Sequence, residues 1–192
     1  MYLKGGIIIE EKVLKLKELI NGEDKSIINK LINNVLNLEI KEIKYDKNIQ
    51  LSNISEYEFE LVKVKAILKN DDEFEMYLKV IKNSKIKESI FCYWCTIYEE
   101  ELFKTKEIEN MVNKVLISDL TKTKYQKRVF LTIENNTTQI LQTGTEINFI
   151  DISEYIEENK TEKNKFEKLY KYFNKQKDEV LLVGIKMDRH LR

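Results

Sequence analysis

The chain has 192 residues, of which 42% are hydrophobic and 34% are charged, a composition typical of one folded, water-soluble domain rather than of a disordered chain. Its 33 basic and 33 acidic residues cancel, so no overall field attracts the chain to a polyanion, and any nucleic-acid contact must come from a local patch. No apolar run approaches the roughly 20 residues of a membrane helix, and the first residues lack the pattern of a secretory signal. The sequence therefore predicts a cytoplasmic location without membrane contact.

The first part of the chain is expected to form two helices and a strand. A short apolar run at residues 7–9 precedes a helical pattern that Asn21 and Gly22 interrupt. The next helix should bury a wide face, because six apolar residues recur at helical spacing: Ile27, Ile28, Leu31, Ile32, Val35 and Leu36. Residues 40–45 alternate between apolar and polar types, which predicts a strand.

Residues 58–82 form two alternating runs around a polar loop, a pattern that predicts a β-hairpin. With residues 70–72 near the tip, the expected register pairs Val62 with Val80 and places Lys63 directly across from Lys79. One face of this hairpin is then apolar. The opposite face carries Lys63, Lys65, Glu75, Tyr77 and Lys79, and any function should be sought there.

The second half continues the alternation of helices and strands. Expected elements are a helix over 84–103 capped by Ser84, a strand or helix end over 114–120, strands over 128–133 and 146–152, a charged helix over 154–177, and a short buried strand from Val180. Ile86, Ile90, Tyr93, Trp94 and Ile97 should share one face of the first of these helices. This order predicts a single α/β domain over residues 1–192, with 154–192 as a C-terminal extension of a helix and a strand.

Cys92 and Cys95 form a C-x-x-C motif inside the expected helix. A redox site would need the first cysteine at a helix N-terminus, where the helix dipole lowers the thiol pKa. A zinc site would need two more ligands, and the only histidine is His190 in the terminal tail. The favoured interpretation is therefore a pair of core thiols, with no metal and no cofactor.

Several segments taken together resemble a known family. The residues LKELINGEDKSIINKLINNVLNLEIKEIKY, the hairpin, ESIFCYWCTIYEEEL and EINFIDISEY occur in the order of corresponding segments in the recombination-promoting nuclease/transposase family of the PD-(D/E)XK superfamily. The resemblance covers residues 14–175. It implies a restriction-endonuclease-like core, with a helix, a β-hairpin within a mixed sheet, a helix and further strands. It also implies metal-dependent DNA endonuclease activity.

The residues at the family's catalytic positions depart from its pattern. The family's V-K-A matches Val64 to Ala66, so its metal-binding aspartate falls on Lys63, and its Glu-x-Gln falls on Tyr77 to Lys79. Mg²⁺ prefers carboxylate oxygens, whereas an ammonium group repels the cation and a phenol, with a pKa of about 10, is neutral. The positions Lys63, Tyr77 and Lys79 are therefore degenerate. Glu75 shares their face and is a candidate migrated ligand, although an ion-pair partner is the favoured interpretation.

The lysines of this face require partners, because like charges placed opposite one another are unfavourable on a sheet. The candidates are Glu75, a helix acid such as Glu88 or Glu23, or a bound phosphate. An internal acid is favoured over a phosphate, since buried charges are generally paired. The densest basic run lies elsewhere, in TKTKYQKR, where Lys124, Lys127 and Arg128 form the best candidate patch for DNA, with a solvated loop as the favoured alternative.

Three functional hypotheses follow. The preferred one is a catalytically degenerate nuclease-like protein that serves as a binding or regulatory module, associated with a mobile element and contacting DNA weakly. The second is an active Mg²⁺-dependent endonuclease whose ligands have moved, with Glu75 and Lys79 taking part. The third is a structural or oligomerisation protein, in contact with itself or another protein and without a nucleic-acid role.

Overall fold

The computed structural model describes residues 16–22, 25–50, 60–90, 92–93, 96, 114–134, 140–159, 161, 166, 169 and 178–186. Its elements in chain order are α2 (Lys25–Leu36), β1 (Ile40–Gln50), β2 (Glu60–Leu68), β3 (Glu73–Lys82), a 3-10 turn η1 (Asn83–Lys85), β4 (Lys114–Lys122), β5 (Gln126–Glu134), β6 (Ile140–Ile150), α4 (Ile152–Glu158) and β7 (Glu179–Lys186). A helical segment follows η1 directly and includes residues 86–90. None of the described helices is long and apolar enough to span a membrane.

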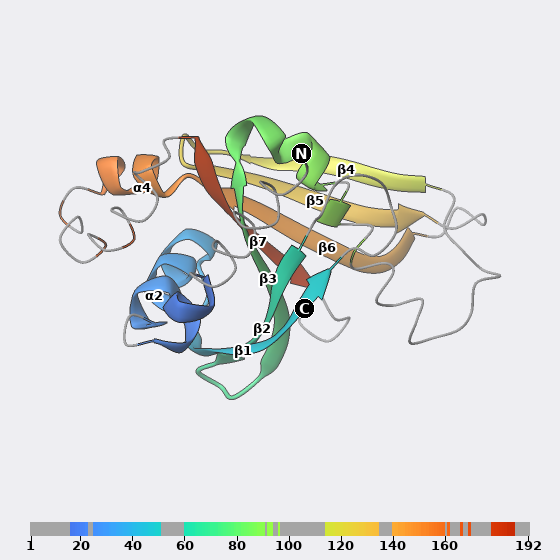
Figure 1. The fold of residues 1–192 in the computed structure, drawn as a ribbon. Helices are drawn as coiled ribbons and strands as arrows, with labels where there is room; N and C mark the ends of the chain where they lie inside the picture. Colours follow the sequence, from blue (N-terminus) through green and yellow to red (C-terminus); the bar gives the residue numbers. More distant parts are fainter. Residues whose placement is uncertain are drawn as a thin grey trace, which may run out of the picture.

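The strands form one seven-stranded sheet in the order β1-β2-β3-β7-β6-β5-β4, with helices on both sides of it (Figure 1). This arrangement confirms the α/β class. All six neighbouring pairs are antiparallel, so the sheet is not the mixed one expected within that class. Residues 114–120, predicted as either a strand or a helix end, are part of strand β4.

The C-terminal strand β7 lies in the middle of the sheet, paired with β3 on one side and β6 on the other. Residues 179–186, part of the expected C-terminal extension of residues 154–192, thus lie within the main sheet. Leu181, Val183 and Ile185 join the core on one face of the sheet, and Val180 and Leu182 join the core on the other. A short continuous apolar run is typical of a strand buried on both faces, which is the position that β7 occupies.

Two cores flank the sheet. The first core is packed by the helical residues 16–20, α2 and α4, together with Phe166 and Leu169 from the charged segment. The second core is packed on the opposite face by the helical segment after η1, through Ile86, Ile90 and Tyr93. The burial of these three residues confirms the expected helix face; the side chains of Trp94 and Ile97 lie outside the described residues.

Two junctions differ from expectation for local reasons. Strand β6 ends at Ile150 and α4 begins at Ile152, because the Asp151 carboxylate accepts a hydrogen bond from the Glu154 backbone N–H at 2.9 Å and so caps the helix. This helix ends at Glu158; of the expected range to residue 177, residue 169 is again helical, and most of residues 160–177 lie outside the described residues. Ser84 lies within η1, and no side chain caps the start of that turn.

Candidate functional site

The β2–β3 hairpin places the residues of the candidate site, and its register is set by the turn. Lys63 pairs with Tyr77, so the expected pairing of Lys63 with Lys79 is wrong by two positions. The backbone N–H of Asp71 donates to the Leu68 carbonyl at 3.0 Å, and Asp71 adopts a left-handed φ of 66°. This short loop, centred on residue 70, is a common hairpin connection. A shift of two positions leaves every side chain on its expected face.

The part of this face around Lys63 and Tyr77 is not solvated. Lys63 is only 4% exposed and Tyr77 only 1% exposed, and Tyr77 belongs to the second core with Leu61 and Ile81. The helical segment after η1 covers this part of the sheet. An ammonium group in such a place requires a close anionic partner, because its desolvation is otherwise uncompensated.

Glu75 is that partner. The Lys63 Nζ lies 2.6 Å from Glu75 Oε1, and the Tyr77 hydroxyl donates to Glu75 Oε2 at 2.9 Å. The ammonium also lies 5.8 Å from the centre of the Tyr77 ring and 4.0 Å from Asp46 Oδ2. The expectation of an internal acid, with Glu75 among the candidates, is confirmed. Of the other acids considered, Glu88 pairs with Lys85, and Glu23 lies outside the described residues.

Tyr93 closes this cluster from the helical side. Its ring meets the Tyr77 ring edge-on, with the centres 5.9 Å apart and the planes at 80°. Burial raises the pKa of Tyr93 well above its ordinary value, and the negative charge of Glu75 adds to the shift. The ring lies against Gly184 of β7, where a Cβ atom would overlap it. Glycine is therefore required at position 184 as long as the Tyr93 ring packs at this point of β7.

The structure thus brings Lys63, Glu75 and Tyr77 together and places Lys79 further along β3, opposite Leu182 of β7. Both oxygens of Glu75 are engaged by donors, and the Lys63 ammonium beside them opposes the approach of a cation. Within the described residues, no group of three histidine, cysteine, aspartate or glutamate side chains could hold a metal ion. This cluster has the chemistry of a buried ion pair rather than that of a metal site.

Cys92 behaves as a core thiol. It lies inside the helical segment and packs against the second core. Burial raises the pKa of Cys92; Lys79 opposes this shift and Glu88 adds to it. The thiol is therefore protonated at neutral pH, unlike the reactive cysteine of a redox motif. Cys95 lies outside the residues whose side chains are described.

The candidate DNA patch is largely compensated by acids. Lys124 Nζ lies 2.5 Å from Glu154 Oε2, and Arg128 Nη2 lies 2.5 Å from Glu146 Oε2. Hydrogen bonding to Glu154 raises the pKa of Lys124. Lys127, between these two, is exposed. The patch therefore offers less positive charge to a phosphate backbone than its sequence suggests.

The partner of Arg128 belongs to a polar chain that the sequence reasoning missed. Buried Glu146 accepts from Asn148 Nδ2 at 2.8 Å, and Asn148 Oδ1 accepts from Gln126 Nε2 at 2.8 Å. A signal was present in β6, where an acid and an amide two positions apart interrupt an otherwise apolar run. Two polar residues on one face of a buried strand predict partners on the neighbouring strand.

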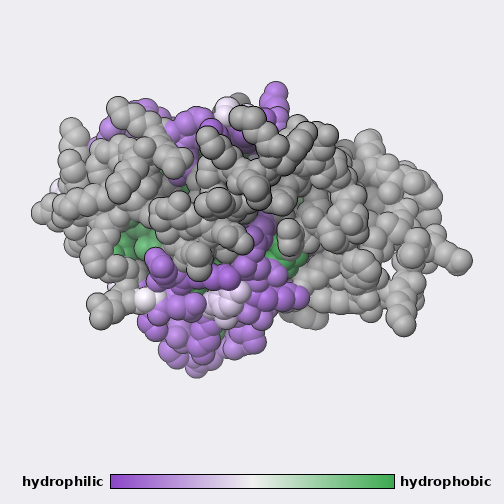
Figure 2. Space-filling view, viewed as in Figure 1, coloured by the Kyte–Doolittle hydropathy of each residue, from purple (hydrophilic) through white to green (hydrophobic). Residues whose placement is uncertain are grey.

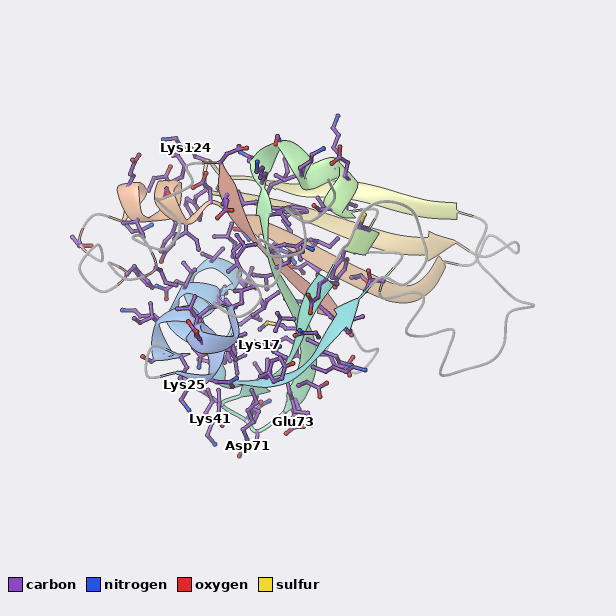
Figure 3. The ribbon with its side chains drawn as sticks, viewed as in Figure 1. Lys17, Lys25, Lys41, Asp71, Glu73 and Lys124 are labelled. Atoms are coloured by element: carbon purple, nitrogen blue, oxygen red, sulfur yellow. The ribbon has the colours of Figure 1, made fainter. Side chains whose placement is uncertain are left out.

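Other exposed lysines gather at the far end of the molecule and are paired too. Lys41 lies 2.8 Å from Asp71 at the hairpin tip, and Figure 3 shows these two far from Lys124. Lys44 and Lys25 both contact Glu42, at 3.4 and 3.6 Å. Figure 2 shows the resulting hydrophilic surface over the lower part of the molecule. This end offers three exposed lysines, Lys25, Lys41 and Lys44, equal in number to the basic residues of the candidate patch.

Comparison with protein-family models, with curated proteins and with solved structures found no match to this chain.

The Lys63–Glu75 pair predicts unequal effects of removing its two members. Glu75→Gln leaves the buried ammonium without its nearest carboxylate. We expect the free energy of unfolding to fall by about 2–3 kcal/mol. This loss is at or below the low end of the cost of breaking a buried ion pair, because the Glu75 side chain is 38% exposed. Lys63→Met should cost less, roughly 1 kcal/mol, because water can solvate the remaining carboxylate. Urea unfolding at neutral pH measures both. Equal costs, or a larger cost for Lys63→Met, would contradict the buried-pair description.

Proposed function

We propose that this chain is a nuclease-like protein of the PD-(D/E)XK superfamily that no longer cleaves DNA and acts as a binding or regulatory module. The cluster of Lys63, Glu75 and Tyr77 carries the proposal, because Lys63 and Tyr77 stand where the family resemblance places metal-binding acids. These two residues are also opposite each other on adjacent strands, as the two acids of such a motif need to be. The elements follow in the order of the resembling segments, with a helix, three strands, a helix, three strands, a helix and the final strand β7, although the sheet is antiparallel throughout.

A nuclease with migrated ligands is the weaker alternative. Catalysis of this kind uses Mg²⁺ held by carboxylates to lower the pKa of the attacking water and to stabilise charge in the transition state. On β2 and β3, the strands that carry the two motif positions, Glu75 is the one acid close to both of them. The ammonium of Lys63 already contacts this carboxylate. Binding a cation there would bring two positive charges together.

A structural role without nucleic acid is the other alternative. It is favoured by the acids that neutralise Lys124 and Arg128.

The proposal predicts no metal-dependent DNA cleavage. Linear, supercoiled and single-stranded DNA should all remain intact with Mg²⁺ or Mn²⁺, because neither Lys63 nor Tyr77 can hold the ion. Gel assays over long incubations measure this, with the Glu75→Ala variant purified in parallel to identify contaminating activity. Turnover by the parent chain that Glu75→Ala abolishes would show that the ligands have migrated and that the chain is an enzyme.

Restoring the motif acids should create a cation site. In the double variant Lys63→Asp, Tyr77→Glu, the new acids stand opposite each other beside Glu75. When a chelator removes divalent ions, these carboxylates repel one another. Mg²⁺ or Mn²⁺ should therefore stabilise the folded variant. The gain grows with free metal and reaches about 2.7 kcal/mol at a hundredfold excess over Kd. Thermal melts with and without metal measure it.

The matched control for this experiment is Lys63→Met, Tyr77→Phe, which removes the same polar groups without adding acids. Its melting temperature should ignore divalent ions, as should that of the parent chain. A folded acid variant that also ignores millimolar metal would refute the assignment of Lys63 and Tyr77 to the motif positions.

DNA is the partner that the proposal favours, through Lys124, Lys127 and Arg128. Because two of these three are paired with acids, we expect weak binding that falls steeply with salt. Replacing the three by alanine should remove most of the binding at low salt, measured by fluorescence anisotropy. The control Lys25→Ala, Lys41→Ala, Lys44→Ala makes the same change in net charge at the other end of the molecule. Equal losses in both triple variants would mean that the contact is not made by this patch, and no binding by the parent chain would favour the structural role.

A further inference from the structure

The strand order leaves β1 and β4 at the two ends of the sheet (Figure 1). Within the described part of the chain, β4 pairs with β5 alone, and β1 pairs with β2 alone. An end strand presents backbone N–H and C=O groups along its outer side, and these can pair with another strand. The two ends differ in how far they are protected against such pairing.

Strand β1 carries features that protect a sheet edge. Its register with β2 is interrupted twice, between Ile40 and Glu42 and between Tyr45 and Lys47. Four of its exposed residues are charged: Lys41, Lys44, Asp46 and Lys47. Bulges and exposed charges, lysine above all, are the usual means by which proteins prevent edge-to-edge association.

Strand β4 lacks these features over most of its length. Its pairing with β5 is regular from Lys114 to Asp119, and the single interruption lies near its end, between Asp119 and Thr121. The residues between Lys114 and Asp119 are Val, Leu, Ile and Ser, so no charge interrupts this stretch. A regular, uncharged end strand is suited to pair with a further strand.

We propose that β4 is the interface through which two copies of this chain associate, pairing antiparallel about a two-fold axis so that the two sheets become one. A second copy suits this edge because the chain has no net charge, so two copies do not repel each other at long range. Such an interface is self-complementary, as two-fold symmetry requires. The inference rests on the strand order and is independent of the proposed function.

The regular stretch of β4 and its charges guide the register. An axis perpendicular to the sheet keeps each face on its own side, so position i of one copy pairs with a position of the other that differs by an even number. An axis at Asp119 would place two aspartates opposite each other, which is unfavourable, and would carry the pairing past the interruption between Asp119 and Thr121. An axis at Ile117 pairs residues 115–119 of the two copies, all within the regular stretch, and brings no like charges together.

Sedimentation equilibrium and cysteine cross-linking test this interface. The parent chain should form a dimer whose population rises with concentration. In a Cys92→Ala, Cys95→Ala background, Ile117→Cys should form an intermolecular disulfide under mild oxidation, because opposed residues of antiparallel strands have Cα atoms about 4.5–5.5 Å apart, within the disulfide range. The control is Leu131→Cys, whose position pairs with Ile117 inside one chain and lies one strand away from the edge.

Two results would overturn the proposal. One is a parent chain that stays monomeric at every concentration, which would mean that something other than a second copy covers the edge. The other is a dimer in which Ile117→Cys cross-links no better than Leu131→Cys, which would place the contact elsewhere. The sedimentation measurement needs no substitution, so the first result remains decisive even if a cysteine variant fails to fold.

Discussion

The pairing of β7 with both β3 and β6 is the constraint on which the rest of the structure depends. It joins the three N-terminal strands to the three strands of the second half, and it brings Gly184 opposite Tyr77. Because β7 is the last described element, its pairing with β3 joins residues far apart in the sequence, such as Met76 and Ile185. Contacts of large sequence separation cost the most entropy to form, so the full sheet requires nearly the whole chain.

The buried ion pair depends on this closure. With β7 in place, the helical segment packs Tyr93 against Gly184 and Tyr77, and the Lys63 ammonium is removed from water beside Glu75. A buried ion pair often adds little net stability over an apolar pair of similar volume, yet removing one member is costly. Such a pair holds the face in one arrangement and opposes the entry of a cation, which links the packing of the sheet to the proposed loss of catalysis.

Compensation of charge is a general property of the described surface. Lys124 and Arg128 meet acids from α4 and β6, and the lysines around the hairpin tip meet acids from β1 and the turn. A neutral chain with locally paired charges attracts polyanions only weakly, and two copies of it repel each other only weakly. Contacts of this molecule should therefore depend more on shape and backbone pairing than on long-range electrostatics.

Local patterns in the sequence determined which residues share a face, and long-range contacts decided what each face meets. Alternation placed Lys63, Glu75 and Tyr77 together, helical spacing identified Ile86, Ile90 and Tyr93, and the need to pair a buried charge included Glu75 among the candidate partners. Alternation has a period of two, so it cannot distinguish registers that differ by two positions, and the left-handed Asp71 decided between them. The central place of β7 and the pairing of Arg128 with Glu146 follow from the order in which strands assemble, a tertiary property that no single stretch of sequence contains.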